Sequence, residues 1–183
     1  MSEPEAQLVR RAKKDPQAFG LLYERYVDRI YSYILFRTSN EQDAEDLTAR
    51  TFHQALASIR NYNERGFPFS AWLYRIAHNL VANWHRDHHR RPQVSLDEVW
   101  PLLSKGRPSP DGVAEKNSEE DSLRAVIQGL PPDRQLLLVL KFGEGKSNSE
   151  IGKVLGRSEG AVKSLFHRTL DELRAEMKKR GYE

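Results

Sequence analysis

The chain has 183 residues, of which 38% are hydrophobic, and its 29 Lys and Arg exceed its 26 Asp and Glu by three. These values suit one ordinary domain or two small ones with lean cores, and the absence of cysteine excludes a disulfide scaffold, a thiolate zinc finger and a cysteine nucleophile. No apolar run approaches the roughly 18 residues of a membrane span and no secretory signal opens the chain, so we expect a cytoplasmic protein without membrane insertion.

Apolar residues recur at spacings of three and four through residues 1–91, which predicts helices rather than strands. Asp15 followed by Pro16 predicts the start of a helix that continues to about Arg37, and a short helix is expected before it. Asn40 predicts the N-cap of the next helix. Together these segments predict a small N-terminal helical bundle.

A loop at residues 61–68, which contains Asn, Gly and Pro, precedes a third amphipathic helix. The inward face of that helix is predicted to consist of Leu73, Ile76, Ala77, Leu80 and Trp84. A basic tail follows, and Pro92 is expected to end the helix.

Residues 92–116 contain four of the nine prolines, which predicts a flexible linker. Helices are expected to resume near Asn117. The predicted fold is therefore all-α, with an N-terminal helical domain at residues 1–91 and a C-terminal helical domain at residues 117–183.

Charge is distributed unevenly over these segments. Residues 1–91 carry 14 basic and 11 acidic residues, residues 92–122 carry 3 and 7, and residues 123–183 carry 12 and 8. Two basic blocks thus flank an acidic one. This distribution is compatible with an ordinary solvated surface, and it becomes a sign of nucleic-acid binding only where the basic residues share one face.

A helix-turn-helix pattern lies in the C-terminal block. Ser147 and Glu150 form a capping box, Gly156 marks a tight turn, and Ser158 caps the last helix. At about 100° per residue, one face of the last helix lies opposite its apolar stripe. That face consists of Gly160, Lys163, Ser164, His167 and Arg168. Small, polar and cationic residues suit a major-groove contact, but a charged outer face is normal on any surface helix.

Four segments resemble bacterial sigma factors of the sigma-70 family, in the extracytoplasmic-function (ECF) group. Residues 149–168 resemble the C-terminal domain of these proteins, and residues 130–135 resemble the start of that domain. Residues 43–52 resemble the acidic helix that binds core RNA polymerase, and residues 69–79 resemble the promoter-melting helix. The resemblance implies a sigma factor that binds core RNA polymerase and promoter DNA, with an anti-sigma factor as a further partner.

The resemblance also implies roles for individual residues. Polymerase binding would involve Asp43, Glu45, Asp46 and Arg50. Recognition of the −10 element would involve Arg65, Phe67, Phe69, Trp72, Arg75, His78, Asn79, Arg86, Arg90 and Arg91. Recognition of the −35 element would involve Arg157, Ser158, Gly160, Lys163, Ser164, His167 and Arg168.

Several of these residues also have a purely structural explanation. Acidic residues in a first helical turn complement the helix dipole, and core packing is the better explanation for Trp84 and for Phe52. Phe67 and Phe69 are each compatible with the core or with a captured base. The sequence departs from the family at Arg50, where an acid is frequent, and its compact 61–68 loop leaves the captured base open.

Other functions are disfavoured by the sequence. No phosphate-binding loop or nucleophile elbow is present, so we expect no enzyme, no cofactor and no small-molecule substrate. His85 and His89 are four residues apart, but an arginine-rich tail is a poor place for a cation, so we expect no metal. A stand-alone helix-turn-helix regulator with an N-terminal effector or dimerisation domain is the main alternative, and a protein-binding adaptor is a third.

Overall fold

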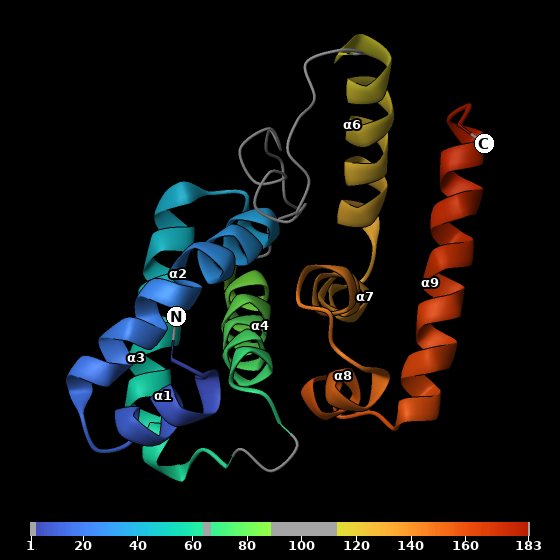
Figure 1. Cartoon of the computed structure of the whole chain (residues 1–183). Helices are drawn as coiled ribbons and strands as arrows, with labels where there is room; N and C mark the ends of the chain where they lie inside the picture. The colour runs from blue at the N-terminus through green and yellow to red at the C-terminus, as the bar shows by residue number, and fades with distance from the viewer. Residues whose placement is uncertain (1–2, 64–66, 89–112, 183) are drawn as a thin grey trace. The chain divides into compact units, whose positions relative to one another are not determined.

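The computed structural model describes residues 3–63, 67–88 and 113–182, and every regular element in these ranges is helical (Figure 1). This confirms the predicted all-α fold. Contacts between residues divide the chain into two compact units, Met1–Val94 and Ser95–Glu183. We call them the N-terminal unit and the C-terminal unit and describe each by itself.

The N-terminal unit contains four α-helices and a short 3₁₀ turn within the described residues. They are α1 (Glu5–Ala12), α2 (Pro16–Thr38), α3 (Glu41–Ser58), η1 (Ile59–Asn61) and α4 (Phe69–His88). Both predicted N-caps are confirmed, because Asp15 accepts a hydrogen bond from the Gln17 amide at 2.9 Å and Asn40 accepts one from the Asp43 amide at 2.9 Å. Ser39 ends α2 with a left-handed φ of 56°.

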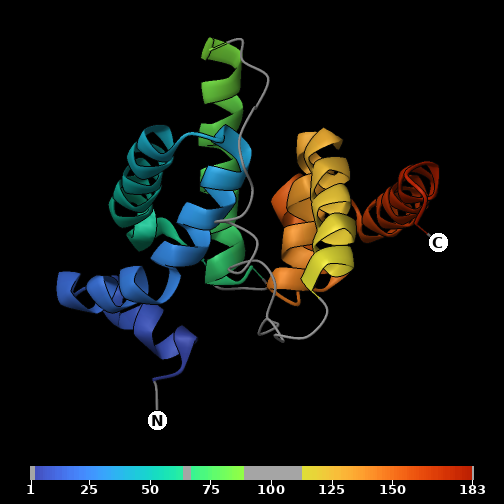
Figure 2. The ribbon, with the colours of Figure 1, turned by 90° about the horizontal axis from the view of Figure 1, so that it is seen from above.

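Helix α2 is the centre of this unit and packs against α1, α3 and α4 (Figures 1 and 2). Its apolar side chains Leu22, Ile30 and Ile34 are fully buried. Burying a side chain of this size contributes about 1.5–3 kcal/mol. Tyr33 of α2 contacts the ring of Tyr74 edge-on at 5.4 Å, which joins α2 to α4. Helices α3 and α4 therefore pack on the same apolar core, and each has a second face that points away from it.

The buried arc of α4 differs from the prediction in one respect. Leu73, Ile76, Ala77 and Trp84 are buried as expected, but Leu80 is only half-buried. Ser70, Tyr74 and Val81 are buried as well, so the true arc is wider and is displaced towards these residues. The arc is wider because α4 contacts two helices, α2 and α3, whereas an apolar stripe read from sequence assumes one partner surface.

The C-terminal unit contains four α-helices and one π-helical turn within its described residues. They are α6 (Val113–Gly129), α7 (Pro132–Leu138), η2 (Val139–Gly143, the π-helical turn), α8 (Asn148–Leu155) and α9 (Glu159–Lys179). Helix α6 begins at Val113, so the last residues assigned to the 92–116 linker are helical. The sequence missed this start because residues 113–120 contain no apolar stripe. The rest of the predicted linker lies outside the described residues.

One core cluster holds α6, α7 and α9 together. Val126 and Leu130 of α6 meet Leu138 of α7 and Leu173 of α9, all buried. Five partly buried residues pack around them, namely Leu123, Ile127, Phe166, Leu170 and Met177. The cluster fixes the C-terminal half of α9 through Leu173 and Met177. The N-terminal half of α9 packs against α8.

Candidate nucleic-acid and protein interfaces

The turn between α8 and α9 has the geometry expected of a helix-turn-helix motif. Gly156 ends α8 in the left-handed region with φ 65°, and the Arg157 amide donates to the Gly152 carbonyl at 2.8 Å. A Cβ on Gly152 would lie 2.5 Å from the Arg157 carbonyl oxygen. The turn therefore approaches α8 so closely that a side chain at position 152 would displace it.

The two helices of this motif have the predicted caps. Ser147 accepts from the Glu150 amide at 3.2 Å, and Glu150 accepts from the Ser147 amide at 2.7 Å, which completes the capping box. Burial acts to raise the pKa of Glu150, but the Ser147 hydrogen bonds, with Lys146 and Lys153 nearby, lower that pKa overall. Ser158 accepts from the Ala161 amide at 3.3 Å and so caps α9.

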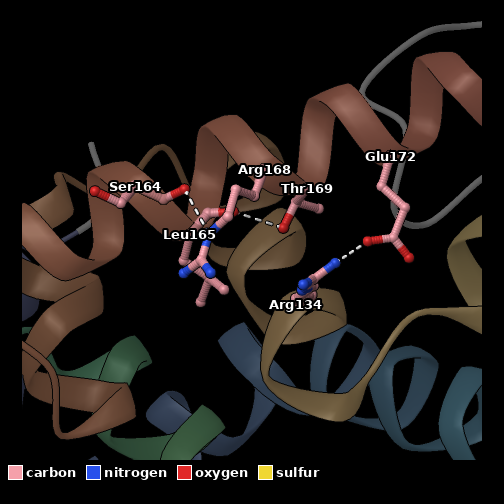
Figure 3. Close-up of polar contacts among 6 residues, drawn as sticks. All are labelled: Arg134, Ser164, Leu165, Arg168, Thr169 and Glu172. Atoms are coloured by element: carbon pink, nitrogen blue, oxygen red, sulfur yellow. Dashed lines mark hydrogen bonds and ion pairs between the residues drawn. The ribbon is translucent and has the colours of Figure 1, made fainter.

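The outer face of α9 is exposed as predicted, and its inner face is buried. The exposed residues are Gly160, Lys163, Ser164, His167 and Arg168. The buried ones are Val162, Leu165, Thr169 and Leu173, whereas Phe166 and Met177 are only half-buried. The Thr169 hydroxyl donates to the Leu165 carbonyl at 2.8 Å, which satisfies it inside the unit (Figure 3). The α9 face is thus free of apolar side chains and carries two cations beside one histidine.

Two ion pairs join α7 to α9 and to the turn between α8 and α9. Arg134 pairs with Glu172 of α9 (Figure 3), and Arg157 pairs with Asp133 at 2.9 Å. The Arg157 guanidinium therefore already has a carboxylate partner. A contact with a DNA phosphate would replace the ion pair with Asp133. The partners are separated by 38 and 24 residues, so no sequence spacing could have revealed Asp133 or Arg134.

Helix α4 carries a second polar face. Arg75, Asn79 and Arg86 are exposed, and Trp72 is half-buried on the same side of the helix. His78 is half-buried, and its Nδ1 lies 3.0 Å from the Tyr33 hydroxyl, so the ring orientation is set by α2. Phe67 is half-buried ahead of the helix. Three of the predicted contacts, Arg65, Arg90 and Arg91, lie outside the described residues, as does His89.

Phe69 corrects the predicted set. Its side chain is 1% exposed and packs among the rings of Tyr26, Tyr62 and Trp72 at centroid distances of 5.8, 5.7 and 5.6 Å. A side chain so enclosed cannot stack on a base. Phe69 therefore belongs to the core, and we remove it from the candidate DNA contacts.

The acidic face of α3 is exposed. Glu45, Asp46 and Arg50 are exposed, and Asp43 is half-buried in the first turn. Asp46 and Arg50 form an i,i+4 pair at 3.6 Å, of the kind that contributes only about 0.3–0.5 kcal/mol on a helix surface. Phe52 is buried, which confirms it as a core residue, and Leu47 of the same helix is buried as well.

Two further structural findings concern metals and membranes. Among the described residues, no group of three or more His, Cys, Asp or Glu side chains is arranged to hold a metal ion. No helix in the described ranges combines the length and the apolar character that a membrane span requires.

Comparison with known proteins identifies both units. Residues 22–91 match the family Sigma-70 region 2, and residues 120–173 match Sigma-70, region 4. The ECF RNA polymerase sigma factor BldN of Streptomyces coelicolor is 38% identical over 91% of this chain, which spans 63% of BldN. The ECF RNA polymerase sigma factor ShbA of Streptomyces griseus subsp. griseus is 33% identical over 72% of this chain and 70% of its own length.

A solved structure has the same fold. CnrH, in complex with the cytosolic domain of CnrY, is similar with a TM-score of 0.68 and 24% sequence identity, over 96% of this chain and 97% of CnrH. The family resemblance seen in the sequence is confirmed. The chain belongs to the ECF group of the sigma-70 family of RNA polymerase sigma factors.

Proposed function

We propose that this chain binds core RNA polymerase and directs promoter-specific initiation of transcription through the −10 and −35 elements. The observation that carries the proposal is the exposed cationic face of α9, set beside a capped helix-turn-helix in a chain of the sigma-70 family. We assign polymerase binding and −10 recognition to the N-terminal unit and −35 recognition to the C-terminal unit.

In this proposal α9 enters the major groove at the −35 element. Lys163, His167 and Arg168 are exposed on one face near its N-terminal end, where a recognition helix meets base edges and phosphates. The N-terminus of α9 is the positive end of the helix dipole, which favours a phosphate at the same end. Binding should weaken with salt, because each phosphate neutralised releases counterions.

The polar face of α4 would bind the −10 element. Arg75 and Arg86 supply positive charge along the helix, and Asn79 supplies an amide between them. Trp72 offers a ring on which an unpaired base could stack. This combination suits a DNA strand that has been separated from its partner, because stacking requires an accessible base face.

The acidic face of α3 would bind the polymerase. Glu45 and Asp46 are exposed and Asp43 is half-buried, so this face would complement a basic protein surface. Arg50 reduces the net charge of this face by pairing with Asp46. The contact would therefore be weaker than one made by acids alone, and the two units would rely on their connection in one chain to act together.

The compartment and the partners that we propose follow from family membership. We place the protein in the cytoplasm with core RNA polymerase, promoter DNA and an anti-sigma factor as its partners. The chain would contribute binding and duplex opening, and the polymerase would contribute the chemistry of RNA synthesis.

The test is promoter-dependent transcription by bacterial core RNA polymerase on templates with random upstream sequences, with and without the full chain. Start sites that appear only with the chain and that share two spaced elements support the proposal and identify the promoter. No stimulation, with the chain folded and binding DNA as a dimer, would overturn it in favour of a stand-alone regulator.

A further inference from the structure

Tyr62 is the centre of an aromatic cluster at the start of α4. It is 5% exposed and follows η1 directly. Its ring lies 4.8 Å from that of Trp72, tilted by 35°, and meets Phe69 edge-on at 5.7 Å. Its hydroxyl donates to the Phe67 carbonyl. Tyr62 thus joins the two ends of the segment between η1 and α4, because residue 62 stands at one end and residue 67 at the other.

Lys13 fastens this cluster to α1. It is the C-cap residue of α1, and its Nζ donates to the Tyr62 carbonyl oxygen at 2.6 Å. The same ammonium lies 5.8 Å from the centroid of the Tyr62 ring, within the range of a cation–π contact. Lys13 is half-buried and 49 residues away in the chain. Its charge is therefore directed at Tyr62 rather than outward.

Trp72 is more exposed than the other two aromatic residues, Tyr62 and Phe69. Its indole is covered on one side by Tyr62 and Phe69 and is half-buried overall. We call Lys13, Tyr62, Phe69 and Trp72 the Tyr62 cluster. A ring held in this way loses little conformational entropy when a base stacks on it. It therefore binds the base more strongly than a freely rotating side chain would.

We propose that Lys13 and Tyr62 are positioning residues that hold Trp72 in the orientation needed to stack on a base of single-stranded promoter DNA. This inference rests on the proposed function, in which the face of α4 binds the −10 element. Lys13 itself does not contact the DNA. Its role is to fix the Tyr62 backbone, which in turn fixes the ring against which Trp72 leans.

The test measures the affinity of the full chain, assembled with core RNA polymerase, for two labelled DNAs. One is a single-stranded oligonucleotide with the −10 element found in the transcription experiment, and the other is a duplex with the −35 element alone. We expect Lys13→Met to weaken single-strand binding about tenfold, the size of one lost stacking contact, and to leave duplex binding unchanged. Tyr62→Phe keeps the ring and should cause a smaller loss in the same direction.

Two variants serve as controls. Lys14→Met removes the same charge from the neighbouring, exposed residue and should leave both affinities unchanged. Lys13→Arg retains a donor for the Tyr62 carbonyl and should retain single-strand binding. The salt dependence separates positioning from direct contact, because loss of a phosphate contact would reduce the slope of log K against log salt by about 0.7 for a single strand. We expect the slope of Lys13→Met to match that of the wild type.

Each other outcome overturns the inference in a recognisable way. Equal losses in Lys13→Met and Lys14→Met would mean general electrostatic attraction, and a reduced salt slope would mean a phosphate contact by Lys13. Parallel losses on both DNAs would mean that Lys13 supports folding only, and wild-type affinity in Lys13→Met would mean no role. Failure of the wild-type assembly to bind the single strand would instead refute the proposed role of α4, and this inference with it.

Discussion

At the scale of single residues, Gly152 allows the turn between α8 and α9 to approach α8 closely. Its α-carbon faces the Arg157 carbonyl so closely that a Cβ would lie 2.5 Å from that oxygen, whereas a Cβ on Gly160 would meet no atom within 4 Å. Both glycines lie in helices, so the same substitution at the two positions separates the steric effect from helix propensity.

Gly152→Val should destabilise the C-terminal unit by about 2–3 kcal/mol, because the turn must move away from α8 to admit the side chain. Gly160→Val should change the stability by less than about 0.5 kcal/mol, because valine and glycine differ little in an exposed helix. Amide hydrogen exchange in α9 measures the free energy of opening of this region. Equal losses in the two variants would show that position 152 is not crowded.

Removal of one cation from the α9 face tests the DNA contacts residue by residue. Lys163→Ala and Arg168→Ala should each weaken binding to −35 duplex DNA and should reduce the slope of log K against log salt by about 1 where a phosphate contact is lost. Arg174→Ala is the matched control, because Arg174 is exposed on α9 outside the predicted face and pairs with Asp171 at 3.3 Å. Equal effects of all three changes would contradict a defined recognition face.

At the scale of elements, the capping box stabilises the start of α8. A helix of eight residues gains little from propensity alone, so its caps contribute much of its local stability. Glu150 adds a pH-dependent part to this contribution. Its pKa is lowered in the folded chain, so its stabilising effect is present above the pKa of the unfolded chain and is lost as the pH falls through the lowered value.

Ser147→Ala should destabilise α8 by about 1 kcal/mol at neutral pH, because the Glu150 amide loses its side-chain acceptor. Glu150→Gln should remove the pH-dependent part. As the pH falls below about 4.3, the ordinary value for glutamate, the wild type should lose its stability advantage over this variant. Thermal unfolding of both proteins at neutral and acidic pH measures the difference. An advantage that is constant over this range would refute the role of the Glu150 charge.

The elements also show how far local pattern predicts structure. The starts of α2, α3, α8 and α9 were predicted to the residue, because each depends on a cap bonded within three residues in sequence. The start of α6 at Val113 and the π-helical turn at Val139–Gly143 were not predicted. Residues 113–120 contain no apolar stripe, and residues 139–143 carry no cap or turn signal of their own.

At the scale of the whole molecule, the two units are expected to divide the work of initiation. The acidic face of α3 belongs to one unit and the cationic face of α9 to the other. Each contact would be modest alone, and their joint effect would come from the high effective concentration that one chain imposes on the second contact.

Asp46→Ala should weaken binding to core RNA polymerase several-fold, and Arg168→Ala should leave that binding unchanged while lowering promoter use. The double variant should show the sum of the two free-energy losses, because the residues lie in different units. Titration of the polymerase with labelled chain, followed by transcription from the identified promoter, measures both quantities. Loss of polymerase binding in Arg168→Ala would contradict the division.

The sequence by itself determined the helical class, the caps, the apolar stripe of α9 and the family, because each depends on residues close together in the chain or on a motif that they form. Only the tertiary structure decided that Phe69 is buried, that Arg157 pairs with Asp133, and that Lys13 holds Tyr62. These contacts join residues 24 to 49 positions apart or enclose a ring on several sides. Their existence depends on how helices pack, which no local spacing encodes.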